Sequence, residues 1–339
     1  MLCYEYKIME VYHNVKIFKK ILIIVAIVLA ALITLLLLIK AGERIIYSGF
    51  YSKADREFTT PGLNDNCVPQ GFDYIAEKES FLMCGYMSDD TASRVYLIDK
   101  DGKATYAEMK EADGSDHTGH TGGVSHFDKF LYVTDNDGLN VYHLDDLLSG
   151  KDELVEIGTV PTFLDPAWCY IHGDYILAGT FYEPGSYETP EEQRLTTPAG
   201  DQNTSLITVF RLDATQPLGV DPTPVAAIST PDRVQGFCVT DTGEVALSTS
   251  WSINSSMLYL YDAEKLTAQG TFTVNGVEVP LVYMDSASLT RTVKAPPMAE
   301  GILCIDGRLY VLNESACNKY IFGKLLSGYG LYSYDLKED

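Results

Sequence analysis

Five strings of one kind recur along the chain and decide its fold: VPQGFDYI (68–75), HTGGVSHF (120–127), DPAWCYIH (165–172), RVQGFCVT (233–240) and MAEGILCI (298–305). Each has a small residue near its start, followed by the short alternation that is typical of a β-strand. The strings lie about 45 to 70 residues apart, a spacing that indicates a repeat protein. The sequence therefore predicts an architecture of similar β units.

A turn and a second strand rich in Tyr, Val and Leu follow most of these strings, and a third strand often comes next. The second strands read KFLYVTD (129–135), DYILAGTFY (174–182), GEVALSTSW (243–251) and GRLYVLNES (307–315). Hairpin-favouring dipeptides mark the turns, among them Asp101-Gly102, Asp137-Gly138 and Asp306-Gly307. Four-stranded units of this length predict an all-β fold, a five-bladed β-propeller.

The two ends of the repeat region support the count of five blades. The last unit stops at Asp339, one strand short, and RIIYSGF (44–50) reads as an isolated strand without a blade of its own. Placing 44–50 as the outer strand of the last blade would close the ring and leave no open edge. A six-bladed ring is the alternative, because 270–285 (GTFTVNGVEVPLVYMD) holds more strand-like sequence than one blade needs.

An unbroken apolar run precedes the repeats at 21–39, ILIIVAIVLAALITLLLLI. A helix of this length spans roughly 28 Å, close to the thickness of the hydrocarbon core of a bilayer. Lys16, Lys19 and Lys20 stand just before it and predict a cytoplasmic N-terminus. We therefore expect a short cytoplasmic segment (1–20), a transmembrane signal-anchor and a propeller domain (44–339) outside the cell. A cleaved secretory signal is the alternative, but the run is longer than usual and KAGERIIY lacks a clear cleavage site.

Charge narrows the range of partners. The chain has 339 residues and a formal net charge of −22, although its first 40 residues hold five Lys and two Glu. The outer part is therefore strongly acidic and should repel nucleic acid and anionic lipid headgroups.

The six cysteines beyond Cys3 follow a buried pattern, so we expect mostly free thiols, with Cys304 and Cys317 as the first pair to test for a disulfide.

Several strings resemble those of bacterial secreted or membrane-attached β-propeller proteins whose activity is unassigned. The strings are PQGF (69–72), DGSDHTGHTGGV (113–124), VQGF (234–237) and KAPPMAEGILCIDGRLYVLNESACNKY (294–320). At the level of fold, the outer domain is also similar to YncE-like and quinoprotein-like propellers. Five-bladed rings include calcium-dependent apyrases and some furanosidases, but fold alone does not imply function.

Propeller geometry predicts where a functional site would form. Inner strands begin on one face of the disc, and the loops between second and third strands return to that face, so polar residues from both gather at one mouth of the central channel. The inner-strand starts supply Gln70, Asp116, His117, His120, Asp165, Gln235 and Glu300. The ends of second strands supply Asp135, Tyr182, Glu183, Trp251, Asn313 and Glu314. Two insertions, 183–204 and 315–328, also reach this mouth.

The pattern DHTGH offers a possible metal site. His117 and His120 lie three residues apart with Asp116 beside them, and imidazole and carboxylate groups are common ligands of divalent metals such as zinc or calcium. Asp165 or Glu300 could add a third ligand. The competing interpretation is that both histidines hydrogen-bond backbone groups in a Gly-rich loop.

Matching positions in the repeat hold Gln70, Gln235 and Glu300, each directly before a glycine. They either face the channel as ligand-binding groups or fix strand ends where the glycine permits close backbone approach. Trp168 and Trp251 either stack on a ligand or pack between blades. Asn313 and Glu314 complete the expected binding set.

These features lead to three hypotheses for the outer domain. The first is an extracytoplasmic propeller that binds a small ligand or a protein partner at its acidic, His-containing mouth. The second is a metal-assisted hydrolase on the same face, with Glu300 or Asp165 as general base. The third is a structural module of the cell envelope that uses the rim of the disc. No G-x-S-x-G, Walker or H-E-x-x-H motif is present to choose an enzyme class.

Overall fold

The computed structural model describes residues 2–136, 138–320, 322–326 and 328–337. The chain divides into two compact units, residues 1–46 and 47–339, and each is described by itself. The first unit is one continuous helix, α1 (Leu2–Ile46), which is longer than the predicted span of 21–39. Within its segment 12–46, an 18-residue stretch has a mean hydropathy of 3.5, and the apolar side chains there are exposed. It is long and apolar enough to cross a membrane, although a signal sequence passes the same test.

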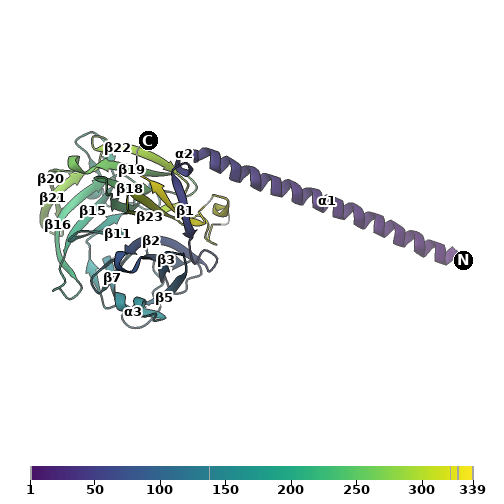
Figure 1. Ribbon diagram of the computed structural model, residues 1–339, viewed down its shortest axis with the longest axis horizontal. Coiled ribbons are helices and arrows are strands. Elements are labelled where there is room, and N and C mark those ends of the chain that lie inside the picture. Colours follow the sequence, from purple (N-terminus) through teal and green to yellow (C-terminus); the bar gives the residue numbers. More distant parts are fainter. Residues whose placement is uncertain (1, 137, 321, 327, 338–339) are drawn as a thin grey trace. The chain divides into compact units, whose positions relative to one another are not determined.

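The second unit is a five-bladed β-propeller, as predicted, in which five sheets follow one another along the chain (Figure 1). Blade 1 holds β2 (Cys67–Ile75), β3 (Ser80–Met87), β4 (Arg94–Asp99), β5 (Ala104–Lys110) and a short added strand, β9 (Glu153–Val155). Blade 2 holds β6 (Val124–Phe127), β7 (Phe130–Asp135), β8 (Gly138–His143) and β10 (Gly158–Pro161). The predicted Asp137-Gly138 turn falls partly outside the described residues.

The remaining blades repeat this order from the centre outward. Blade 3 holds β11 (Pro166–His172), β12 (Tyr175–Thr180), β15 (Ser205–Leu212) and β16 (Val220–Thr230). Blade 4 holds β17 (Val234–Val239), β18 (Glu244–Thr249), β19 (Ser256–Asp262) and β22 (Leu289–Ala295). Blade 5 holds β23 (Ala299–Ile305), β24 (Arg308–Asn313), β25 (Gly330–Asp335) and β1 (Ala54–Thr59). Outside the five blades lie two short helices and a small hairpin: α2 (Ser48–Tyr51), α3 (Leu144–Leu148) and β13 (Leu195–Thr196)–β14 (Gln202–Asn203).

The five inner strands contact one another in a closed ring, in the order β2, β6, β11, β17, β23 and back to β2. Glycines make this close approach possible. A Cβ atom on Gly71 would lie 2.4 Å from the backbone nitrogen of Val124, and one on Gly123 would lie 2.4 Å from that of Cys169. The glycines Gly71 and Gly123 therefore mark places where one blade meets the next, because a side chain there would collide with the backbone of the neighbouring strand.

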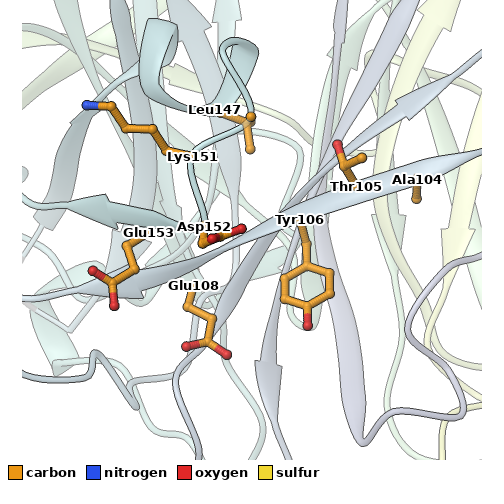
Figure 2. Close-up of a pocket in the computed structure, with 9 residues that line it drawn as sticks. Ala104, Thr105, Tyr106, Glu108, Leu147, Lys151, Asp152 and Glu153 are labelled. Carbon is orange, nitrogen blue, oxygen red and sulfur yellow. The ribbon is translucent and has the colours of Figure 1, made fainter.

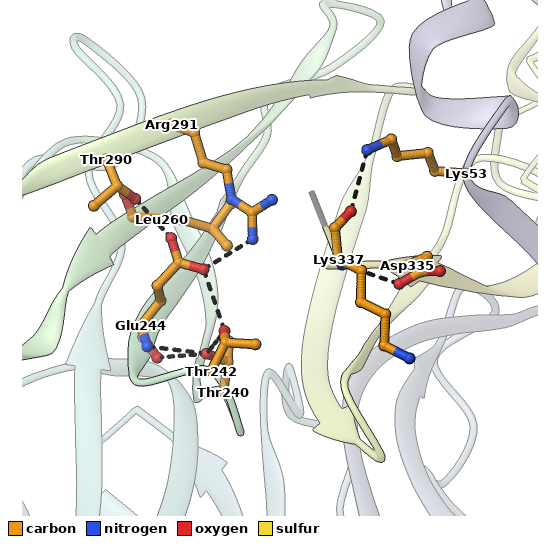
Figure 3. Close-up of polar contacts among 9 residues, drawn as sticks. All are labelled: Lys53, Thr240, Thr242, Glu244, Leu260, Thr290, Arg291, Asp335 and Lys337. Atoms are coloured by element: carbon orange, nitrogen blue, oxygen red, sulfur yellow. Dashed lines mark hydrogen bonds and ion pairs between the residues drawn. The ribbon is translucent and has the colours of Figure 1, made fainter. Parts of the chain in front are cut away.

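The ring is closed by a strand from before the repeats, as predicted, but the predicted location was wrong. Residues 44–46 belong to α1 and 48–51 form α2, so the segment 44–50 is helical. The closing strand is β1, which pairs antiparallel with β25. Figure 3 shows Lys53 just before it donating a hydrogen bond from Nζ to the carbonyl of Lys337 at 3.2 Å. The N-terminal and C-terminal parts of the propeller thus share one blade.

The strand-like sequence at 270–285 does not form a sixth blade. It folds as the hairpin β20 (Ala268–Val274)–β21 (Val277–Tyr283), and β21 pairs parallel with β16, so the hairpin widens blade 3 at its outer margin (Figure 1). The chain then returns to blade 4 as β22, where Arg291 pairs with Glu244 at 2.8 Å (Figure 3). The segment between β19 and β22 therefore leaves blade 4 and extends the sheet of blade 3.

The six described cysteines outside α1 are free thiols, as expected. Five are buried and Cys304 is half-buried. The pair singled out from the sequence is not formed, because the Cys304 sulfur faces the Asp241 carboxylate at 3.8 Å, whereas Cys317 packs with Leu63, Val68 and Ala316. Burial raises the pKa of Cys317 to about 11, and such a thiol is unreactive near neutral pH.

Candidate functional site

Two buried glutamates and two glutamines from neighbouring repeats meet at the predicted mouth. Gln70 at the start of blade 1 donates from Nε2 to Oε2 of Glu314 at 2.8 Å. Gln235 at the start of blade 4 donates from Nε2 to Oε1 of Glu300 at 3.4 Å. Each repeat glutamine therefore holds a carboxyl group of blade 5. The structure brings these four predicted residues together in pairs across blade boundaries.

Glu300 is the most enclosed of the acids, with 2 % of its surface exposed. Its hydrogen-bond donors among the described residues are Gln235 and the Ser250 hydroxyl, both at 3.4 Å and both neutral. Burial, followed by the charge of Glu314, holds the pKa of Glu300 well above its ordinary value. A buried carboxyl group with neutral donors resists ionisation, because a desolvated charge without a cation is unfavourable.

Glu314 lies at the other side of this pair, in the insertion that follows β24. Burial raises its pKa, while the Lys319 charge and the hydrogen bonds from Gln70 and Tyr320 act in the opposite direction. Glu314 is therefore easier to ionise than Glu300. The two acids together form one titrating unit at the mouth, which we call the acid pair (Glu300 and Glu314).

A basic and aromatic group stands beside the acid pair. Lys319 donates from Nζ to the Tyr86 hydroxyl at 2.6 Å and lies over the Tyr86 ring at 4.7 Å from its centroid. The ring of His120 also packs against Tyr86, with centroids 4.5 Å apart. Surrounding protein atoms and the Lys319 charge lower the pKa of His120, so its imidazole is neutral near pH 7. This part of the mouth offers donors and ring faces.

The three residues of the predicted metal site have different partners. The Asp116 carboxylate pairs with Lys110 at 2.5 Å and is exposed, whereas buried His117 hydrogen-bonds from Nδ1 to Glu111 at 2.8 Å. Asp116 forms a β-bridge with Lys110 at the end of β5, so its backbone is extended. In an extended segment consecutive side chains point to opposite sides, which separates Asp116 from His117. Within the described residues, no group of three or more His, Cys, Asp or Glu side chains is arranged to hold a metal ion.

The two tryptophans occupy different environments. Trp168 is buried and stacks on Phe237 of the next blade, with centroids 5.8 Å apart and an interplanar angle of 9°. It therefore packs between blades, which is the second of the two alternatives given for it. Trp251 is partly exposed and forms an aromatic cluster with Phe181 and Tyr187, at centroid distances of 5.7 to 6.0 Å. The cluster joins residues that follow the second strands of blades 3 and 4.

The other two predicted site residues differ in accessibility. Asn313 is buried, and its Nδ2 donates to the carbonyl of Pro297 at 3.3 Å. Its Oδ1 has no hydrogen-bond partner among the described residues. Asp165 lies just before β11 and is exposed. A base for proton abstraction would gain a raised pKa from burial, so of the two proposed bases the structure gives that property to Glu300.

The floor of the mouth is closed. Below it, the inner strands leave about 10 Å³ between Gly71, Gly123, Gly236 and Gly301 and their neighbours. This volume is at the lower limit for one water molecule. The central channel is therefore closed at the level of these four glycines.

A separate hollow of about 550 Å³ opens on the outer edge of blade 1. Figure 2 shows Tyr106, Glu108 and Thr105 on one side of it and Lys151, Asp152 and Glu153 on the other. It is larger than the space at the floor, but its lining comes from β5, α3 and the segment between α3 and β9. The mouth draws side chains from several blades, which is the usual construction of a ligand site, so we place the functional site there.

Several residues of the site were not selected from the sequence. Tyr86 follows the same rule as the others, since it lies near the end of β3, the second strand of blade 1. Applying the rule to that blade would have found it. Ser250 precedes Trp251 and carries no motif of its own, and Tyr187 and Tyr320 lie in insertions, where no periodic pattern indicates direction.

Comparisons with known proteins give no function for this chain. No protein-family model and no curated protein matches this chain. Among solved structures, the PQQ-bound aldose sugar dehydrogenase from Streptomyces coelicolor is 12 % identical with a TM-score of 0.45, over 83 % of this chain and 96 % of that one. Glutaminyl cyclase from Myxococcus xanthus is 12 % identical with a TM-score of 0.44, over 84 % and 97 % of the two chains. The resemblance to quinoprotein-like propellers stays at the level of fold, and we transfer no activity, cofactor or substrate.

The acid pair should make stability depend on pH. Burial raises the pKa of Glu314 to about 7 and holds that of Glu300 well above its ordinary value. Below pH 4.5 both carboxyl groups are protonated in the folded and in the unfolded chain, so the acid pair does not lower the free energy of unfolding there. As the pH rises towards 7, the unfolded chain releases the protons of Glu300 and Glu314 before the folded chain does. The free energy of unfolding therefore falls with rising pH.

We therefore expect a Glu300→Gln variant to lose less stability between pH 5 and pH 8 than the wild type does. Chemical denaturation of the full-length protein in detergent at the two pH values measures this difference. Glu278→Gln, at an exposed position of β21, is the matched control and should keep the wild-type dependence. An unchanged pH dependence in Glu300→Gln would contradict the assignment of Glu300 as a buried acid with a raised pKa.

Proposed function

We propose that this protein is a membrane-anchored propeller outside the cell that binds a small ligand at the mouth formed by the acid pair. The observation that carries the proposal is the convergence of Gln70, Gln235, Glu300 and Glu314 from three blades above a closed floor. Polar groups that converge from several elements of a fold are typical of ligand recognition. A purely structural module would not need buried acids there, because they lower stability near neutral pH.

The location rests on α1 and on the charge distribution. The long apolar helix follows Lys16, Lys19 and Lys20, which favour a cytoplasmic N-terminus. The acidic propeller would then face the exterior and, because of its charge, would bind neither nucleic acid nor anionic lipid headgroups. Protease added to intact cells should digest the propeller, and protection until the membrane is opened would place it on the cytoplasmic side instead.

Ligand binding at the mouth predicts a thermal shift that depends on the acid pair. A panel of small amines, sugars and amino acids is screened against full-length protein in detergent, because a ligand that binds the folded state raises Tm. We expect at least one class to raise Tm of the wild type by a few degrees. The shift should disappear in Glu300→Gln and in Glu314→Gln.

Glu278→Gln serves again as control and should keep the full shift, since Glu278 is exposed on the outer hairpin of blade 3. A shift that survives both acid-pair substitutions would place the ligand elsewhere, with the hollow in Figure 2 as the next candidate. No shift with any class would contradict small-ligand binding. Trimming the insertion 183–204 would then test capture of a protein partner.

A further inference from the structure

We propose that the hollow on the outer edge of blade 1 binds an extended, basic peptide segment of another protein, which adds to the sheet as a strand beside residues 104–106. This surface is separate from the mouth, so the inference goes beyond the proposed function and does not depend on it. Addition of a strand to an exposed sheet edge is a recurring mode of peptide recognition, in which main-chain hydrogen bonds supply the affinity.

The first step of the argument is the direction of the backbone groups of β5. On its inner side β5 pairs with β4 over residues 104–108. The N–H of Glu108 points away from β4 and donates to the carbonyl of Asp152 at 2.8 Å. Successive residues of a strand direct their N–H and C=O groups to opposite edges, so the groups of Ala104 and Tyr106 face outward together with those of Glu108.

The second step is that β9 covers only half of this outer edge. It pairs in parallel with residues 108–110 of β5 and stops there. Within the described part of the chain, the outward N–H and C=O groups of Ala104 and Tyr106 have no hydrogen-bond partner. Two donors and two acceptors, repeated at about 7 Å along the strand, are therefore left for another chain to pair with.

The chain before β9 explains why the edge stays open. Gly150 has a φ of +77°, which turns the chain sharply after α3. The N–H of Lys151 then donates to the carbonyl of Asp146 at 3.0 Å, so this segment remains with α3 and reaches the sheet only at Asp152. A strand in line with β9 but opposite residues 104–106 is missing for this reason.

The hollow lies at this uncovered half of the edge. Its volume of about 550 Å³ falls within the range of roughly 300 to 1,000 Å³ that is usual for ligand sites. In Figure 2 the side chains of Tyr106 and Glu108 point to one side of β5 and that of Thr105 to the other, so an added strand would meet side chains on both faces. The Tyr106 ring is 43 % exposed and is packed under the Arg94 guanidinium at 4.2 Å from its centroid. It offers a cross-strand contact to a side chain of the peptide.

The charge of the lining favours a basic peptide. Three of the lining residues are acidic: Glu108, Asp152 and Glu153. Lys110 pairs with Glu108 at 3.6 Å and with Glu153 at 3.4 Å. Asp152 is exposed and forms no ion pair with the described residues. A Lys or Arg side chain of the peptide would be attracted to Asp152, and an acidic peptide would be repelled.

The occupant is a segment of a different protein for two reasons. The outer strands of this propeller accept a further strand in parallel, since β9 adds to β5 and β21 adds to β16. A second copy of the chain would bring the same acidic lining to the edge, and like charges in contact are unfavourable. A basic, extended segment avoids that repulsion.

The test measures binding of a fluorescent, acetylated and amidated heptapeptide, VTVKVTV, to full-length protein in detergent by anisotropy. Peptides with Gln or Glu in place of the central Lys are the comparison. The Lys peptide should bind several-fold more tightly than the Gln peptide, and the Gln peptide more tightly than the Glu peptide. Hydrogen exchange of the amides of Ala104 and Tyr106 should slow when the Lys peptide binds, because they become hydrogen-bonded.

Methylation of the peptide amides tests whether the peptide binds as a strand. Only one set of alternate amides faces β5, because successive amides of a strand point to opposite edges. N-methyl groups on that set should weaken binding at least tenfold, and N-methyl groups on the other set should change it less than twofold. Equal effects of the two sets would contradict strand addition.

Substitutions in the protein test the location. Asp152→Asn should remove the preference for Lys over Gln, whereas Asp174→Asn, at an exposed position between β11 and β12, is the matched control and should keep it. Ala104→Pro removes one outward N–H at the first residue of β5, where an edge strand tolerates proline, and should lower affinity several-fold. Glu300→Gln should leave peptide binding unchanged, so failure at the mouth and failure at this edge are distinguishable.

Three results would overturn the inference. They are binding by none of the three peptides, equal binding by all three, and binding that is insensitive to both Asp152→Asn and Ala104→Pro. Self-association of the protein that Ala104→Pro abolishes would assign the edge to a second copy of the chain instead.

Discussion

A Gly71→Ala variant should lose about 3 kcal/mol of its free energy of unfolding, or fail to fold, although it adds a single methyl group. The new Cβ atom would lie 2.4 Å from the nitrogen of Val124 and 2.6 Å from the Cα and carbonyl carbon of Gly123. All three are backbone atoms of the next inner strand, so no side chain can move aside. The blades would have to separate at the centre, where every other contact of the ring is fixed.

Gly270→Ala is the control for this substitution. Gly270 lies in β20 at the outer margin, and nothing lies within 4 Å of the position a Cβ atom would take. Alanine there should leave stability unchanged or raise it by up to about 1 kcal/mol, because it loses less conformational freedom than glycine on folding. Chemical denaturation followed by tryptophan fluorescence measures both variants. Equal stability of the two would show that the centre of the ring tolerates expansion.

A Phe50→Ala variant should lose about 3 to 5 kcal/mol, the usual cost of removing a buried phenylalanine ring. Phe50 is 1 % exposed, stacks on Tyr334 at 5.5 Å and meets Tyr332 edge-on at 5.9 Å. It packs the turn of α2 against β25, the strand that β1 joins to close the ring. The substitution therefore weakens the closing blade at its junction.

Phe322→Ala removes the same ring from a position that is 79 % exposed and should change stability by less than about 0.5 kcal/mol. Thermal unfolding of both variants in detergent, compared at equal protein concentration, gives the difference. If Phe50→Ala unfolds at the wild-type temperature, α2 is not part of the cooperative unit that holds blade 5 together.

The inner strands were predictable because each must present a small residue to its neighbour and apolar residues to the space between blades. The closing strand was not, and its sequence ADREFT explains why. Only Phe58 of the six residues in β1 is buried, so an outermost strand carries no apolar alternation. RIIYSGF is richer in apolar residues, but the first residues of the string continue a helix already formed. Tertiary position outweighed local pattern here.

The candidate site shows the same limit. The glutamines and glutamates were identified by their equivalent positions in the repeat, and the structure joins them as Gln70–Glu314 and Gln235–Glu300. Asp116 and His117 were grouped because they are adjacent in sequence, but adjacent residues of an extended segment face opposite ways. The aromatic cluster brings together residues of blades 3 and 4 that only folding makes neighbours.

The pairing of β1 with β25 also determines when the propeller can close during synthesis. Residues 54–59 are among the first of the propeller to be made, and their partner strand at 330–335 is among the last. At roughly 5 to 20 residues per second, β1 waits on the order of 15 to 60 seconds for its partner. Throughout that interval its backbone donors and acceptors form an open edge that another nascent chain could capture. Chaperones that bind the nascent chain would therefore matter most before the final strand emerges.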